Sequence, residues 1–223
     1  TFVFEKMGIS LNYGLARGIG SGTYAIMSLA LGYFVNRFSP SLLPYFYATI
    51  SFITLIVILT LTIPKIDENV DKKEEEQISI KDFLKKYKSL NLIFVGSILL
   101  IFDQTLINNF FVQVVTNVGG DVETMGRALF TQAMVELPTM FLFVKLQKKF
   151  GNKNLMIVAA IFFSVKHVLT YLAGSMTMIY FIMVTQTLSN ALFVPAAVYY
   201  VGRKVEEKDL NKGQALIASS MTI

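Results

Sequence analysis

Long apolar runs alternate with short polar gaps along this chain. Six of the runs reach or approach the ~20 residues that a transmembrane helix needs. Because their apolar residues are continuous rather than alternating, they predict helices and not the strands of a barrel. We therefore expect an all-α membrane protein. The six predicted spans are 13–35, 42–63, 91–115, 121–146, 153–174 and 176–201.

A seventh apolar stretch runs from Ala215 to Ile223, where the sequence ends. It is too short to cross a bilayer. The first residue is Thr1 rather than Met. We therefore expect an internal piece of a longer protein, with six full transmembrane helices and a truncated seventh in a partial helical bundle.

Lysine and arginine concentrate in alternate gaps. The gap 64–90 carries seven, and 145–153 and 203–212 carry four each, whereas the gap after the first span carries only Arg37. The positive-inside rule places the three basic gaps in the cytoplasm.

The gap 64–90 also holds as many acidic as basic residues, which is typical of a solvated linker. Its end, residues 78–90, has the spacing of an amphipathic helix on the membrane surface. We expect 1–63 to be the end of an N-terminal bundle, 64–90 a cytoplasmic inter-bundle linker, and 91–223 a C-terminal bundle.

Composition narrows the function. Hydrophobic residues make up 54% and charged residues 16%, against ~25% charged in soluble domains, and the mean hydropathy is +0.57. The net charge of +5 follows from the basic gaps, so no nucleic acid partner is expected. With no cysteine, one histidine and no phosphate-binding loop motif, we expect no enzyme, no cofactor and no metal site.

Charged residues inside membrane spans are costly and usually functional. Both positively and negatively charged residues are present within the spans, which implies ion pairs or a water-filled cavity. The ionisable residues within the predicted spans are Arg17, Asp103, Arg127, Glu136, Lys166 and His167.

The first span carries Arg17, Ser21 and Tyr24 on one helical face. A guanidinium can donate two hydrogen bonds to hydroxyl groups, and an aromatic ring can stack on the C–H face of a sugar. The alternative is an arginine that extends to the cytoplasmic interface.

The fourth span places Gln132 and Glu136 on one face. A carboxyl in a low-dielectric cavity can bind and release a proton near neutral pH. The alternative is an acid permanently paired with Lys166 or Arg17.

The other spans offer further candidates. Asp103 is either a cavity acid or a member of a structural ion pair, and His167 either packs or carries a proton. Lys166 points about 100° away from His167. Gln186 and Asn190 form a neutral stripe, suited to a polyhydroxylated or amide-bearing solute or to helix–helix contact.

Four segments resemble a known family when taken in order. They are YGLARGIGSGTYA (13–25), FDQTLINNFF (102–111), the region from ETMGRALF through KLQKKFGNKNL to SVKH (123–167), and the part of the sixth span that leads up to Val194–Pro195. Their order and spacing resemble the oligosaccharide:proton symporters of lactose permease type, in the major facilitator superfamily. The resemblance implies helix five to the start of helix eleven, with helices one to four and twelve missing.

The resemblance also implies roles for several residues. Arg17 would bind sugar hydroxyls, Tyr24 would stack on the sugar ring, and Asp103 would join an interhelical salt bridge. Lys166 stands where those permeases have an arginine used in proton coupling.

The chain departs from that family at functional positions. Arg127 stands in place of a sugar-binding glutamate, Asn190 and Phe193 in place of a histidine and a glutamate, and Thr187 in place of the lysine that would pair with Asp103. Lactose specificity is therefore not expected.

The resulting expectation is proton-coupled uptake of a small polar solute, a sugar or oligosaccharide, by alternating access in a bacterial plasma membrane. The solute would bind Arg17, Ser21, Tyr24, Gln132 and the neutral stripe of Gln186 and Asn190. Proton coupling would involve Glu136, Lys166, Asp103 and His167, with Glu136 carrying the proton beside Lys166. Expected partners are the solute, protons, the lipid bilayer and the missing helices of the parent chain. Alternatives are drug efflux, nucleoside transport, or a non-transporting receptor or structural protein.

Overall fold

The computed structural model describes residues 13–60 and 78–222, and side chains from Gly18 onward. Within them the chain is helical. Residues 64–77 of the predicted linker, the end of the second predicted span at 61–63 and the side chain of Arg17 lie outside this description. The described elements are α2 (Tyr13–Arg37), η1 (Pro40–Leu42), α3 (Leu43–Thr60), α4 (Ile80–Lys86), α5 (Lys88–Asn109), α6 (Phe111–Asn117), α7 (Val122–Phe150), α8 (Asn152–Tyr171), α9 (Met176–Val184), η2 (Thr185–Thr187), α10 (Asn190–Lys204), η3 (Glu207–Asp209) and α11 (Leu210–Ser219).

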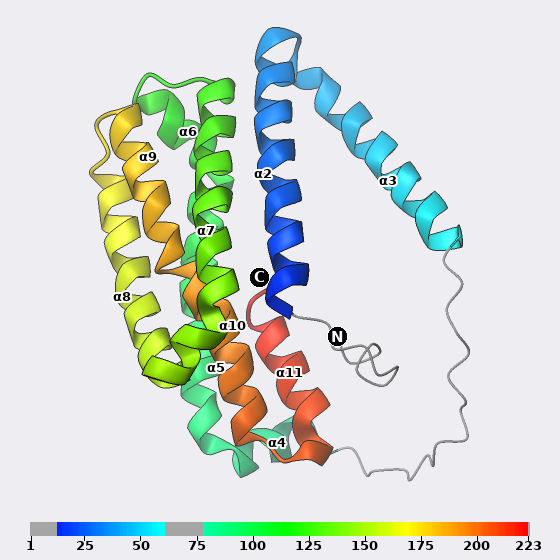
Figure 1. Ribbon diagram of the computed structural model, residues 1–223, viewed down its shortest axis with the longest axis vertical. Coiled ribbons are helices and arrows are strands. Elements are labelled where there is room, and N and C mark those ends of the chain that lie inside the picture. The colour runs from blue at the N-terminus through cyan, green and yellow to red at the C-terminus, as the bar shows by residue number, and fades with distance from the viewer. Residues whose placement is uncertain (1–12, 61–77, 223) are drawn as a thin grey trace.

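The six predicted spans are confirmed, and with them the all-α class. Six helical segments are long and apolar enough to cross a membrane, each within a few residues of its predicted range. The last helix, α11, has 10 residues, too few to span. The junctions α7–α8 and α10–α11 lie at one end of the molecule with α4, here called the basic end (Figure 1).

Two spans are interrupted, which the continuous apolar runs did not predict. The third breaks at Phe110, between α5 and α6, and the sixth breaks at η2, between α9 and α10. Gln186 and Ser189 are buried at the second break. Irregular backbone is tolerated at membrane depth only where protein covers it or a cavity faces it.

Helix α7 is the centre of the assembly. It packs along α2 on one side and contacts α8, α9 and α10 on the other, as Figure 1 shows. One apolar core forms at the basic end around Phe83, Phe163 and Phe193. A second forms at the opposite end around Phe111 and Ile179. By contrast, α3 buries no side chain.

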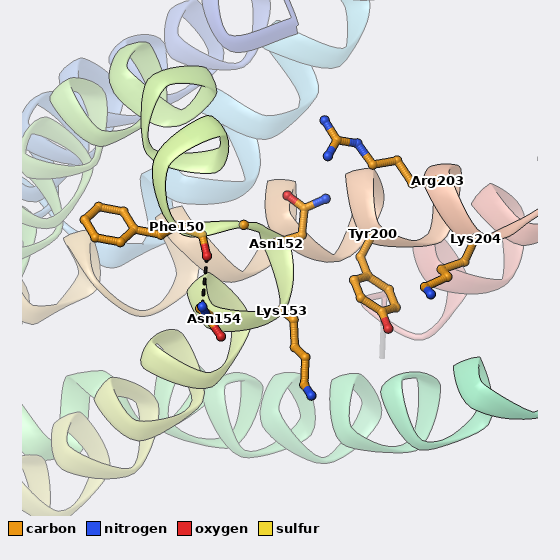
Figure 2. A pocket seen from close by; sticks show the side chains of 8 residues that line it. Phe150, Asn152, Lys153, Asn154, Tyr200, Arg203 and Lys204 are labelled. Carbon is orange, nitrogen blue, oxygen red and sulfur yellow. Dashed lines mark hydrogen bonds between the residues drawn. The ribbon is translucent and has the colours of Figure 1, made fainter.

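The α7–α8 turn at the basic end is tight. Gly151 has φ +76°, in the left-handed region that favours glycine. The amide of Asn154 donates to the carbonyl of Phe150 at 3.0 Å (Figure 2). The turn therefore reverses the chain at a fixed point and starts α8 at Asn152.

Small residues let α2 and α7 approach closely at the end opposite the basic end. A Cβ added to Gly126 would lie 2.6 Å from the carbonyl oxygen of Ser28 and 3.0 Å from the Cα of Gly32. Such backbone contact is typical of membrane helices with small residues at their interface.

An ionic cluster ties α4 to the α10–α11 junction. Lys86 Nζ lies 2.8 Å from Asp209 Oδ2 and 2.9 Å from Glu206 Oε2. The hydroxyl of Tyr87 donates to the same Asp209 oxygen at 2.8 Å. The hydrogen bonds from Lys86 lower the pKa of both carboxyls, and the carboxylates raise the pKa of Lys86. The amphipathic part of the predicted linker is therefore held to the bundle.

The close approach of α2 and α7 predicts that substituting two glycines will change stability differently. Gly126→Ala must push the Ser28 carbonyl away and is expected to lower the free energy of unfolding by ~1–3 kcal/mol. Gly22→Ala, on α2 with nothing within 4 Å of its added Cβ, is expected to be neutral or stabilising by up to ~1 kcal/mol. Thermal unfolding in detergent measures both. Equal effects would contradict the close approach.

The ionic cluster predicts a pH dependence. Because the folded-state pKa values of Glu206 and Asp209 are depressed, their stabilisation is present above pH ~4.5 and is lost as the pH falls below it. Lys86→Met is expected to lower the Tm at pH 7 and to flatten this acid-dependent loss. Lys85→Met, an exposed lysine on the same helix, is the control and should change neither. An unchanged acid profile in Lys86→Met would contradict the assignment.

Candidate functional site: a polar cavity between α2 and the C-terminal helices

A cavity of about 590 Å³ lies between α2 and helices of the C-terminal part of the chain. Its walls combine amides, hydroxyls and one carboxyl group. The lining residues are Gly20, Ser21, Tyr24, Ile101, Gln104, Thr105, Asn108, Gln132, Ala133, Glu136, Gln186, Asn190 and Met221. The cavity thus joins residues of both predicted bundles.

The α2 wall contains two of the predicted residues. Ser21 and Tyr24 lie three positions apart and therefore on one helical face, and both line the cavity. The Ser21 hydroxyl lies 3.7 Å from the sulfur of Met140 on α7. The Tyr24 ring is exposed, so its face is open to a ligand. Arg17 belongs to α2 one turn before Ser21.

The α7 wall contributes Gln132 and Glu136, one turn apart. Glu136 is 7% exposed, which places its carboxyl group almost wholly inside the protein. Pro138 lies within the same helix and removes one backbone hydrogen bond there. The carboxyl group of Glu136, predicted from the sequence as a proton-binding group, therefore lies at the cavity wall.

The opposite walls are rich in neutral amides. On α5, Gln104 Nε2 donates to Asn108 Oδ1 at 2.8 Å. Gln186 lies in η2, within the break between α9 and α10, and Asn190 is the first residue of α10. Such amides can both donate and accept hydrogen bonds, which suits a solute with hydroxyl or amide groups.

Lys166 lies behind this amide wall. It is 1% exposed, and its ammonium donates to Gln104 Oε1 at 3.2 Å and to Gln186 Oε1. Glu136 also lies within electrostatic reach of Lys166. A buried ammonium is costly unless hydrogen-bonded, and two cavity amides meet that need.

Asp103 and His167 pair outside the cavity lining. The Asp103 carboxylate contacts His167 Nδ1, and the Asp103 side chain is 54% exposed. Because adjacent residues on a helix point ~100° apart, Lys166 faces the cavity amides while His167 faces Asp103. Asp103 and His167 therefore lie apart from the predicted site residues that line the cavity.

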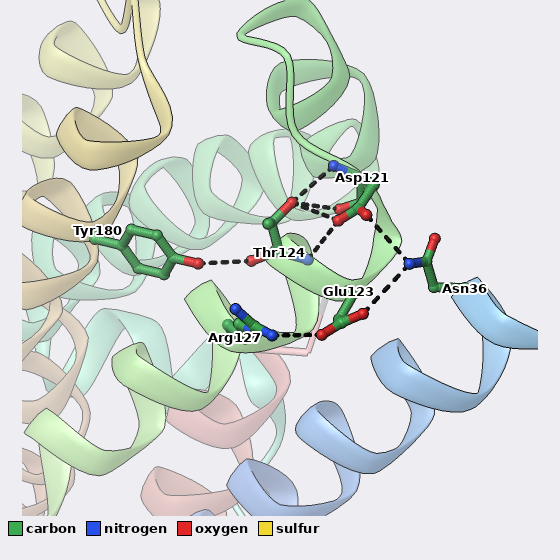
Figure 3. A network of polar contacts seen from close by, with 6 residues as sticks. All are labelled: Asn36, Asp121, Glu123, Thr124, Arg127 and Tyr180. Carbon is green, nitrogen blue, oxygen red and sulfur yellow. Dashed lines mark hydrogen bonds and ion pairs between the residues drawn. The ribbon is translucent and has the colours of Figure 1, made fainter.

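A polar network lies at the end opposite the basic end (Figure 3). The Asn36 amide on α2 donates to Asp121 at 3.2 Å and to Glu123 at 3.3 Å. Arg127 pairs with Glu123, away from the cavity. Asp121 caps α7 with Thr124, whose amide and hydroxyl lower the pKa of Asp121.

Sequence reasoning anticipated much of the lining and missed part of it. Six predicted residues line the cavity, namely Ser21, Tyr24, Gln132, Glu136, Gln186 and Asn190. The α5 residues Gln104, Thr105 and Asn108 were not predicted as site residues. The spacing of Gln104 and Asn108, one turn apart within an apolar span, is the signal that could have identified them.

Comparison with known protein families gives a match that covers nearly the whole chain. The family model described as the MFS_1 like family matches residues 4–222. Comparisons with curated proteins and with solved structures find no match.

The contacts of Lys166 predict non-additive stability. Gln186→Leu removes one acceptor from a buried ammonium and is expected to cost ~1.5–3 kcal/mol of unfolding free energy. Adding Lys166→Met to that variant removes the unsatisfied charge, so the double variant should be more stable than Gln186→Leu alone. Thermal unfolding of the wild type, both single variants and the double variant measures the coupling. Additive losses would contradict it.

Proposed function

Because the chain belongs to the MFS_1 like family, a family of membrane transporters rather than enzymes, we propose that it takes up a small polar solute together with protons. The proposed solute is a sugar or oligosaccharide, the mechanism is alternating access, and the location is a bacterial plasma membrane. The observation that carries this proposal is the polar cavity, which is walled by both predicted bundles and has the buried carboxyl group of Glu136 among its described lining residues.

The lining supports an uncharged, hydrogen-bonding solute. A volume of about 590 Å³ is within the ~300–1,000 Å³ usual for small-molecule sites. The amides of Gln132, Gln186 and Asn190 offer donors and acceptors without net charge. The exposed ring of Tyr24 offers a stacking surface, and the family resemblance adds Arg17 as a donor to hydroxyls.

Glu136 is the proposed proton carrier. It is the carboxyl group on the cavity wall, and Lys166 lies within electrostatic reach. Taking up a proton at Glu136 changes the charge beside Lys166 and turns an acceptor into a hydrogen-bond donor for the solute. Binding of solute and proton is thereby linked. Asp103 and His167 lie outside the lining and are given no part in binding solute.

Alternating access requires α2 to separate from α7 at one end at a time. The Gly32–Gly126 approach is a close contact between them at the end opposite the basic end. In the proposal, this small-residue contact opens and closes as a unit, and its opening exposes the cavity to the outside.

Transport in liposomes tests the proposal. With the protein reconstituted, adding the transported sugar to unbuffered external medium is expected to make that medium alkaline. Glu136→Gln should abolish this proton movement while retaining exchange of solute across the membrane, because exchange needs no net proton transfer. Glu123→Gln, a carboxyl on the same helix paired with Arg127 outside the cavity, is the matched control and should retain both activities.

The outcomes separate the alternatives. Proton-coupled accumulation that persists in Glu136→Gln would refute the assignment of Glu136. If no monosaccharide, disaccharide or nucleoside makes the external medium alkaline and the protein exports lipophilic cations, its function is efflux rather than uptake. Solute binding without flux would indicate a receptor.

A further inference from the structure

A second cavity, separate from the polar one, lies at the basic end between the α7–α8 turn and the last turns of α10. Its volume is about 330 Å³. In Figure 2 the side chains of Lys153 and Lys204 extend the same way as that of Tyr200, and the guanidinium of Arg203 extends to the side of the Asn152 amide. Side chains from two helices thus enclose one space.

The charge of this cavity is entirely positive. Lys153, Arg203 and Lys204 line it, and no carboxyl group is found among its described lining residues. The ammonium of Lys204 lies 5.9 Å from the centre of the Tyr200 ring. Three cations in one small space repel one another unless an anion joins them.

The nearest acidic segment does not supply that anion. Glu206 and Asp209 follow α10 closely in sequence, but their carboxylates bind Lys86 at 2.9 and 2.8 Å. Glu206 also contacts Lys208 at 3.4 Å. Two of the three carboxylates of this segment are therefore bound to Lys86, and the third, Glu207, is not among the described lining residues of the cavity.

The start of helix α8 and the side chain of Asn152 also favour the binding of an anion in this cavity. Helix α8, 20 residues long, starts at this cavity with no side chain capping its first turn, so its free N–H groups and dipole favour an anion. Asn152, 6% exposed, lines the cavity with its Oδ1 lacking a hydrogen-bond partner. In Figure 2 the NH₂ group of Asn152 lies on the side of Arg203, where it can donate a hydrogen bond to an anion.

We propose that this cavity binds a phosphate group, supplied by the headgroup of an anionic phospholipid at the basic end of the bundle. Lysine and arginine side chains with a helix N-terminus are the usual protein ligands of phosphate. Basic pockets between membrane helices bind anionic lipid headgroups. The site does not depend on the proposed transport of solute.

Native mass spectrometry of the chain in detergent, with added phosphatidylglycerol or phosphatidylcholine, tests the site. Phosphatidylglycerol should be retained more tightly than phosphatidylcholine. The triple variant Lys153→Gln/Arg203→Gln/Lys204→Gln should weaken retention by roughly fivefold for each cation removed. The charge-preserving triple Lys153→Arg/Arg203→Lys/Lys204→Arg should keep it.

Two further variants separate a site from general surface charge and from misfolding. The control Lys145→Gln/Lys148→Gln/Lys149→Gln removes three cations from the same end outside the cavity and should leave retention unchanged. Asn152→Asp places a carboxylate in the cavity and should weaken retention by roughly fivefold, because it offsets one of the three cations; the Tm of the variant, measured alongside, shows that it is folded.

The results decide between the sources of phosphate. Competition by inorganic phosphate, with the same sensitivity to Asn152→Asp and without preference for phosphatidylglycerol, would keep the site and assign it to a soluble phosphate. Equal retention of both lipids without such competition, equal weakening in the control triple, or full retention in Asn152→Asp would overturn the proposal.

Discussion

A lipid bilayer offers no hydrogen-bond partners, and this constraint organises the polar part of the molecule. Lys166, a charge in the middle of a span, is satisfied by the amide oxygens of Gln104 and Gln186. Since those oxygens accept from Lys166, the two amide nitrogens are left to face other groups, and that of Gln104 bonds Asn108. The buried ammonium therefore fixes the orientation of the amide wall before any solute arrives.

The break between α9 and α10 follows from the same constraint. Its irregular backbone is held by side chains, with the Thr187 hydroxyl donating to the Val135 carbonyl on α7 at 2.9 Å and the Thr185 hydroxyl donating to Ile182. The contact with Val135 joins the break to α7 beside Glu136. A movement of α7 is thus transmitted directly to the segment that carries Gln186 and Asn190.

The spans and much of the cavity wall could be predicted from the sequence because the bilayer makes apolar length and intramembrane polarity visible in a single chain. Ser21, Tyr24 and Glu136 stand out for that reason. Both helix breaks escaped prediction, since apolar residues continue through them and only tertiary contacts determine where the hydrogen bonding is interrupted. The pairing of Asp103 with His167 also depends on how α5 and α8 are placed, which no spacing within one helix specifies.

The contact between α2 and α7 at the end opposite the basic end combines two kinds of interaction with different consequences. The bonds from Asn36 to Asp121 and Glu123 are exposed, and exposed polar contacts contribute little, ~0–1 kcal/mol for an ion pair. The backbone approach at Gly32 and Gly126 is a packing contact that lipid chains can replace when the helices part. Helices α2 and α7 are thus joined at this end by exposed hydrogen bonds and by small-residue packing. An interface of this kind is compatible with the opening and closing that the proposed alternating-access mechanism requires.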